Sequence, residues 1–148
     1  MTAYQTILVT SDLSDGSLPA LEHAALLGRQ FNAEVILLYC AEDTLPPIML
    51  GVSADQRSEI LSQHRRTAQE RLVEFAGESL QGCQSQVIVV GGGANACIVD
   101  YAKARKVDLI IIASQGKGFL GHSAIGSTTH RLLNHAPCPV LVVPSVHR

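Results

Sequence analysis

One stretch of the chain, residues 108–127, constrains the fold most, because it joins an apolar run, a glycine-rich segment and a helix start. Leu109 to Ala113 are too few for a helix and rich in β-branched side chains, which predicts a buried parallel strand. Glycines follow at 116, 118 and 121, and Gly126-Ser127-Thr128 then opens a helical pattern. A strand, a glycine loop and a helix N-terminus together present backbone N–H groups and a helix dipole to an anion. We therefore expect the phosphates of a nucleotide to bind here.

Strand and helix patterns alternate along the rest of the chain. Strands are expected over residues 6–10, 34–40, 86–90, 107–113 and 140–143, and helices over about 17–31, 56–80 and 94–105 and from about 126. Within the second helix, Leu61, His64, Ala68, Leu72 and Phe75 form an apolar stripe, and Leu132 and Leu133 face inward on the fourth. This alternation predicts an α/β fold class, a doubly wound parallel sheet in a single domain over residues 1–148. If strand order reverses between strands one and four, a crevice opens at their carboxyl ends.

Charge and cysteine content exclude several classes of function. The 11 basic and 13 acidic residues give a net charge of −2, which argues against binding to nucleic acid. No apolar run reaches the roughly 18 residues of a membrane span, and the first residues do not resemble a signal peptide, so we expect a cytoplasmic protein with no membrane insertion. The four cysteines, Cys40, Cys83, Cys97 and Cys138, are widely spaced and form no CxxC pair. We expect them to be reduced and buried rather than disulfide-bonded or bound to zinc.

Two familiar phosphate motifs fail on the glycine loop. Gly116-Lys-Gly-Phe-Leu-Gly121 matches GxGxxG, but that motif requires an acidic residue about 20 positions later. No Asp or Glu occurs after Asp108. A P-loop reading would place His122 at the position of the phosphate-binding lysine, and a neutral imidazole does not supply a fixed positive charge. Only the spacing Gly116-x9-Gly126-Ser127 remains.

That spacing resembles the ATP-binding motif G-x2-G-x9-G-[S/T] of the universal stress protein family. The resemblance covers the entire chain, through Ile7-Leu-Val-Thr-Ser-Asp12, Val35-Ile-Leu-Leu-Tyr-Cys40 and His135-Ala-Pro-Cys-Pro-Val-Leu-Val-Val-Pro144. Ala113 stands where the motif has its first glycine, and Thr10 where nucleotide-binding members often have proline. The resemblance implies a Rossmann-like, adenine nucleotide alpha hydrolase-like sheet of five strands, in the order 3-2-1-4-5, with helices on both faces.

The resemblance also implies a site for ATP or another adenine nucleotide. Three groups of residues are expected to border the adenosine, the ribose and the phosphates in turn: Thr10, Ser11, Asp12 and Cys40; then Ala113, Ser114 and Gln115; then Gly116, Lys117, Gly118, Gly126, Ser127 and Thr128. Mg²⁺ (or Mn²⁺) is expected to be held mainly by the phosphates, since Mg²⁺ keeps most of its water. No protein ligand for the ion and no catalytic residue is predicted. From its position alone, Asp12 could equally cap the following helix.

Three functions are open at this point. The first is an ATP-binding stress-response or regulatory protein, and the second is a dimeric interaction module with a vestigial pocket, which Ala113 and Thr10 favour. The third is a slow ATPase, for which only Asp12 is a nearby acid; phosphoryl transfer needs positioned metal ligands and a base. A homodimer is expected through residues Val140–Val143, an apolar edge strand that family members commonly pair across a two-fold axis.

Overall fold

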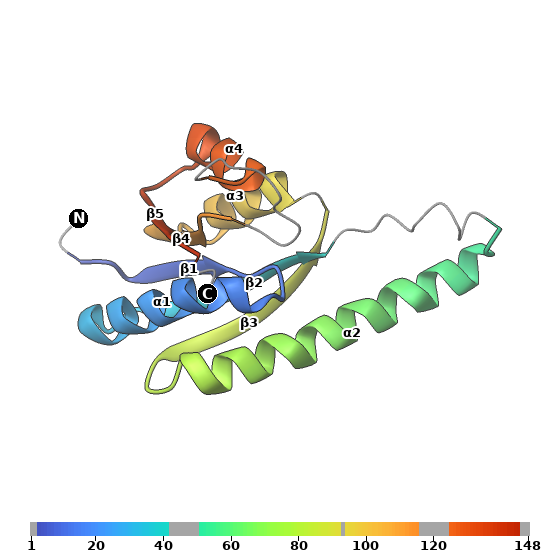
Figure 1. Ribbon diagram of the computed structural model, residues 1–148, viewed down its shortest axis with the longest axis horizontal. Coiled ribbons are helices and arrows are strands. Elements are labelled where there is room, and N and C mark those ends of the chain that lie inside the picture. The colour runs from blue at the N-terminus through green and yellow to red at the C-terminus, as the bar shows by residue number, and fades with distance from the viewer. Residues whose placement is uncertain (1–2, 42–50, 93, 116–124, 146–148) are drawn as a thin grey trace.

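The computed structural model describes residues 3–41, 51–92, 94–115 and 125–145 (Figure 1). Within them the elements follow in the order β1 (Thr6–Thr10), the 3-10 helix η1 (Asp15–Ser17), α1 (Leu18–Phe31), β2 (Glu34–Ala41), α2 (Ala54–Ser79), β3 (Gln84–Gly91), α3 (Ala94–Ala104), β4 (Leu109–Ala113), α4 (Ser127–His135) and β5 (Val140–Val143). The predicted limits of β1 and β5 are confirmed. Most of the other observed boundaries differ from the predicted ones by one or two residues.

The five strands form one parallel sheet in the order β3-β2-β1-β4-β5. β1 lies in the centre, with Ile7 opposite Val35 of β2 on one side and opposite Leu109 of β4 on the other. The predicted fold class and strand order are therefore confirmed. Strand order reverses between β1 and β4, which places a topological switch point at their carboxyl ends.

Helices cover both faces of the sheet, α1 and α2 on one side and α3 and α4 on the other (Figure 1). Side chains alternate along β1 to match. Ile7 and Val9 belong to the cluster under α1 and α2, whereas Leu8 belongs to the cluster under α3 and α4, and all three are fully buried. A strand covered on both faces reads as a continuous apolar run, as β1 does.

Helix α1 packs close to the sheet at Gly28. A Cβ atom built at this glycine would lie 2.6 Å from Cγ2 of Val35 on β2, closer than real Cβ contacts come. Three residues later the helix ends at Phe31, because Asn32 adopts a left-handed conformation (φ 52°) and donates its backbone N–H back to the last turn. Glycine is thus required at position 28 by packing.

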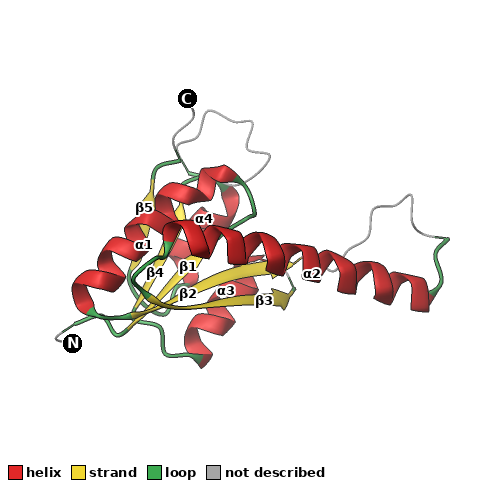
Figure 2. Ribbon diagram, turned by 90° about the horizontal axis from the view of Figure 1, so that it is seen from below, coloured by secondary structure: helices red, strands yellow, loops and turns green. Residues whose placement is uncertain are grey.

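Helix α2 begins earlier than predicted and extends past the sheet (Figure 2). Ser53 and Gln56 form a reciprocal capping box, a sequence signal that places the start at Ala54. A helix of 26 residues is about 39 Å long, whereas an eight-residue strand such as β3 spans about 26 Å. The apolar stripe is therefore not fully buried over the first half of the helix. His64, expected to be partly buried and hydrogen-bonded, is exposed but does share a hydrogen bond with the Tyr39 hydroxyl at 3.3 Å.

The second half of α2 does bury the predicted stripe, since Ala68, Leu72 and Phe75 are buried while Leu61 is half-buried. The prediction for α4 is also half right. Leu132 is fully buried and Leu133 is 45% exposed.

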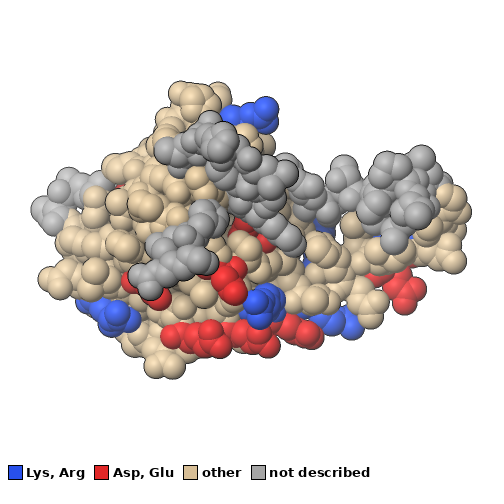
Figure 3. All heavy atoms as spheres, in the orientation of Figure 1, with Lys and Arg blue, Asp and Glu red and all other residues tan. Residues whose placement is uncertain are grey.

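Figure 3 shows acidic and basic side chains interspersed along the side of the molecule on which α2 lies.

Two of the four cysteines contradict the expectation that all are reduced. Cys40 on β2 and Cys97 on α3 form a disulfide, with Cα atoms 6.2 Å apart, whereas Cys83 and Cys138 are free and half-buried. The bonded pair is 57 residues apart in sequence. It meets because the end of β2 and the first turn of α3 lie over each other on one face of the sheet, a tertiary contact that cysteine spacing does not reveal.

Candidate functional site

The chain leaves β1 through a tight turn that its own polar groups hold in place. Thr10 and Ser11 are buried, and the backbone N–H of Ser11 donates to the carbonyl of Leu38 on β2 at 3.1 Å. The Ser11 hydroxyl accepts a hydrogen bond from the Leu13 N–H at 3.0 Å and shares another with the Ser17 hydroxyl at 2.8 Å. Leu13 has a positive φ of 70°, which these contacts stabilise. These hydrogen bonds fix the backbone on both sides of Asp12, which lies between Ser11 and Leu13.

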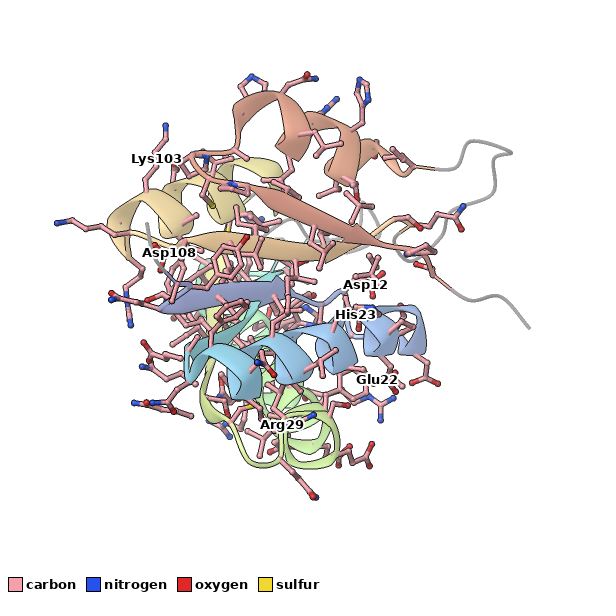
Figure 4. The ribbon with its side chains drawn as sticks, turned by 90° about the vertical axis from the view of Figure 1, so that its left-hand side faces the viewer. Asp12, Glu22, His23, Arg29, Lys103 and Asp108 are labelled. Atoms are coloured by element: carbon pink, nitrogen blue, oxygen red, sulfur yellow. A yellow bond between two sulfur atoms is a disulfide. The ribbon has the colours of Figure 1, made fainter. Side chains whose placement is uncertain are left out.

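The half-buried Asp12 carboxylate organises the turn before η1. Its Oδ1 atom accepts hydrogen bonds from the Ser14 N–H at 3.0 Å and from the Ser14 hydroxyl at 2.5 Å. These bonds close the turn before η1 and go to Ser14, the N-cap residue, rather than to an N–H group of the helix, so they do not show the helix-capping role given above as the alternative for Asp12. Figure 4 shows Asp12 and Asp108 at opposite ends of the sheet. Asp108 is a structural residue: its Oδ2 accepts the backbone N–H groups of Gln5 and Thr6, both at 2.9 Å, and fixes the start of β1.

The first turn of α4 is anchored to the carboxyl end of β4. The buried Thr129 hydroxyl donates to the Ala113 carbonyl at 2.9 Å, and the Gly126 N–H donates to the Ser114 carbonyl at 2.6 Å. Ser114 in turn donates its N–H to Val143 on β5 at 2.8 Å. Gly126 is the N-cap of α4 and has an extended backbone (φ −72°, ψ 166°). The start of α4 is therefore fixed beside the switch point.

These contacts change the expected role of one predicted residue. The Gly126 N–H, expected to donate to a phosphate, is bonded to the Ser114 carbonyl instead. At this end of the loop, Ser127 and Thr128 therefore remain as the candidate donors. An α-helix leaves its first N–H groups without intrahelical partners, which makes these two residues suitable. Thr129 was not predicted as part of the site. The sequence feature that could have indicated it is a third hydroxyl side chain directly after Ser127 and Thr128, in the first turn of the helix.

Four more of the predicted residues, Ala113, Ser114, Gln115 and Cys40, lie within the described part of the chain. Ala113, Ser114 and Gln115 lead out of β4 toward Ser145, whose N–H donates to the Ser114 hydroxyl at 3.1 Å and whose hydroxyl donates to the Gln115 carbonyl at 3.2 Å. Cys40 is the residue before the last one of β2, and its sulfur forms the disulfide. The phosphate-loop residues Gly116, Lys117 and Gly118 lie outside the described residues.

The exits of β1 and β4 lie at the same edge of the sheet. The two strands are parallel neighbours with Val9 opposite Ile111, and η1 is in contact with β4. The structure thus brings residues 10–12 and the start of α4 to the same edge of the sheet. Among the described residues, no group of three His, Cys, Asp or Glu side chains is placed to hold a metal ion, and no helix is long and apolar enough to cross a membrane.

The fold and this arrangement define a doubly wound α/β domain with the start of a helix at its switch point, and sequence comparison gives the family. The profile of the universal stress protein family matches residues 3–144. The chain is 32% identical to universal stress protein MJ0531 of Methanocaldococcus jannaschii over 142 residues, which cover 95% of this chain and 82% of that protein. The chain belongs to the universal stress protein family.

Solved structures agree with this assignment. MJ0577 of Methanocaldococcus jannaschii superposes with a TM-score of 0.85 at 27% identity, covering 99% of this chain and 100% of that one. UspA of Lactobacillus plantarum gives a TM-score of 0.76 at 28% identity, covering 97% and 99%. Two more distant structures contain a ligand: a universal stress protein in complex with cAMP (TM-score 0.64, 22% identity, covering 98% and 100%) and that of Archaeoglobus fulgidus in complex with dAMP (0.58, 20%, covering 95% and 98%).

Proposed function

We propose that this protein binds ATP or another adenine nucleotide in the crevice between the β1 exit and the start of α4, and that it acts as a cytoplasmic regulatory protein of the stress response. The observation that carries the proposal is the anchoring of the first turn of α4 to the end of β4 through Thr129 and Gly126. It directs a helix N-terminus to the switch point, where ligands of open α/β sheets bind. The cAMP and dAMP complexes of distant family members support the adenine nucleotide as the ligand class.

The residues divide the work of binding by chemistry. Ser127 and Thr128 offer hydroxyl and backbone donors to phosphate oxygens, and hydrogen bonds to a charged group are each worth about 1.5–3 kcal/mol. Asp12 accepts hydrogen bonds, so it suits the hydroxyl or amino groups of adenosine. Gly116, Lys117 and Gly118 complete the phosphate side in this proposal. A divalent ion would be coordinated mainly by the phosphate oxygens and would neutralise part of their charge.

Calorimetry with Mg-ATP tests the proposal. We expect one bound nucleotide per chain and an affinity reduced by at least about tenfold in Gly126→Val and in Thr128→Val, because each removes space or a donor for a charged group. Gly77→Val is the matched control, since a Cβ atom there meets nothing within 4 Å. Thermal melts establish that each variant is folded. Absence of binding to wild-type protein at millimolar ATP, ADP, AMP and cAMP would rule out the proposal.

The same samples separate the two other functions. Phosphate release above that of an Asp12→Asn, Ser127→Ala double variant would identify an ATPase. A folded protein that binds no nucleotide but keeps its oligomeric state would identify an interaction module. We expect neither result.

We also propose a homodimer through β5. This strand ends the sheet and its residues 140–142 are half-buried. Pro139 and Val143 direct their carbonyls to β4, so the backbone groups of Val140 and Val142 face the open edge.

Val142→Pro tests this interface. Proline removes an N–H that faces away from β4, so the internal ladder is kept while pairing across the edge is lost. Light scattering should give a dimer for the wild type and for Val142→Ala. This control also loses the valine side chain, but it keeps the backbone N–H that proline removes. Val142→Pro should be a monomer. A wild-type protein that is monomeric at micromolar concentration would contradict the proposed dimer.

A further inference from the structure

The disulfide clamps one strand end to one helix start at the edge of the sheet where the candidate site lies. Cys40 is next to the last residue of β2, and Cys97 lies in the first turn of α3. Both residues are partly exposed, so small thiol and disulfide reagents can reach them. Because parallel strands end at one edge of the sheet, this clamp and the exit of β1 share that edge.

A short backbone path joins the clamp to Asp12. Leu38, two residues before Cys40 on β2, accepts the hydrogen bond from the Ser11 N–H at 3.1 Å. Ser11 holds the β1 exit turn through its hydroxyl, and Asp12 is the next residue. A change in the position of the end of β2 is therefore transmitted to the turn that positions Asp12.

We propose that the Cys40–Cys97 pair is a redox switch that sets the affinity of the crevice for its nucleotide. The proposal rests on the proposed function for the identity of the ligand. With the disulfide formed, the end of β2 is held against α3 and the β1 exit is organised before the ligand arrives. In the reduced form, with two free thiols, the end of β2 and the β1 exit must be ordered during binding, which weakens the affinity for the nucleotide. The oxidised protein is therefore the form that binds nucleotide more tightly.

The switch closes by thiol–disulfide exchange with a low-molecular-weight disulfide. The thiolate of one cysteine attacks a sulfur of that disulfide, forms a mixed disulfide and releases one small thiol. The second cysteine then attacks the protein sulfur of the mixed disulfide and releases the second small thiol. The protein pair loses two electrons and two protons, and the small disulfide gains them.

The two other cysteines provide internal controls. Burial, and then the charge of Asp108, raise the pKa of the Cys138 thiol, so it stays protonated and slow to exchange at neutral pH. The Cys83 thiol donates to the Ala25 carbonyl at 3.4 Å, on the opposite face of the sheet from the disulfide. Neither residue is bonded in the structure.

Calorimetry on the two redox forms of the full chain tests the proposal. Protein treated with oxidised glutathione should bind Mg-ATP at least about fivefold more tightly than protein reduced with dithiothreitol, the lower end of typical coupling between linked sites. Cys97→Ala should bind equally under both treatments, whereas Cys83→Ala should keep the wild-type difference. Equal wild-type affinities in the two forms would overturn the switch.

A reciprocal measurement distinguishes failure of the switch from failure of the proposed function. By linkage, saturating Mg-ATP should shift the equilibrium with dithiothreitol toward the disulfide by the same factor. Mass spectrometry after alkylation reads this from the loss of two hydrogens on the peptides of Cys40 and Cys97. If both residues are alkylated after oxidation while ATP still binds, the switch alone is wrong. If the disulfide forms and neither redox form binds nucleotide, the proposed function is wrong and the switch falls with it.

Discussion

Replacing Leu132 with alanine is expected to lower the free energy of unfolding by about 2–5 kcal/mol. The Leu132 side chain is fully buried and packs in the cluster that α3 and α4 form on the sheet, together with Leu8 and Ile110. Alanine removes the side-chain carbons beyond Cβ and leaves a cavity, because the surrounding packed side chains relax only partly. A loss of this size is a large part of the roughly 5–15 kcal/mol that stabilises a typical domain.

Leu133→Ala is the matched control for this prediction. The substitution is the same and the helix is the same, but Leu133 is 45% exposed. We expect a change of less than about 0.5 kcal/mol, as for most surface substitutions. Urea unfolding followed by circular dichroism measures both values, and equal slopes against urea show that the unfolded states are comparable. Similar losses at both positions would mean that α4 packs in a different rotation from that in the structure.

The pair Leu132 and Leu133 shows where sequence periodicity stops being informative. Two adjacent leucines on a nine-residue helix lie about 100° apart around its axis, and both fit an inward pattern. Which one is buried depends on how the first turn is docked. Here Thr129 and Gly126 fix that docking through hydrogen bonds to the end of β4. Neither bond follows from helical spacing.

Strand patterns were more informative, because a parallel strand covered on both faces must be apolar along its length. The limits of β1 and β5 and the strand order were predicted correctly. The extension of α2 past the sheet was not predicted. The helix is longer than the strands it covers, and its apolar stripe alone does not indicate where the sheet ends. The disulfide between Cys40 and Cys97 was missed for a similar reason, because it reports a contact between elements rather than a local pattern.

For the candidate site, the motif predicted which segments meet but not which atoms are available. The sequence placed Asp12 and the Gly126–Thr128 segment on opposite sides of one crevice, and β1 and β4 do end at the same edge. Two of the donors and acceptors are also used within the protein: the Gly126 N–H bonds to Ser114, and Asp12 Oδ1 bonds to Ser14. Such local hydrogen bonds depend on the backbone path of each turn, which residue types constrain only loosely.

The second large effect is expected at Gly28, where alanine should lower the free energy of unfolding by about 1–2 kcal/mol. Two terms oppose each other. Alanine favours a helix by roughly 0.5–1 kcal/mol over glycine. The added Cβ atom would lie 2.6 Å from Cγ2 of Val35, and overpacking a well-packed core typically costs about 1–3 kcal/mol. Val35 is fully buried on β2 and its branched side chain has few alternative rotamers, so the clash outweighs the gain in helix propensity.

Gly77→Ala separates the two terms, because a Cβ atom at Gly77 meets nothing within 4 Å. Only the helix term acts there, so this substitution should stabilise the protein by roughly 0.5–1 kcal/mol. The same glycine-to-alanine change is thus predicted to have opposite signs on α1 and α2, which thermal and urea unfolding both detect. Val35→Ala supplies the second test, since removing Cγ2 relieves the clash. The double variant Gly28→Ala, Val35→Ala should lose less stability than the sum of its single variants, by about 0.5 kcal/mol or more. Strict additivity would mean that α1 does not lie against β2 at this position.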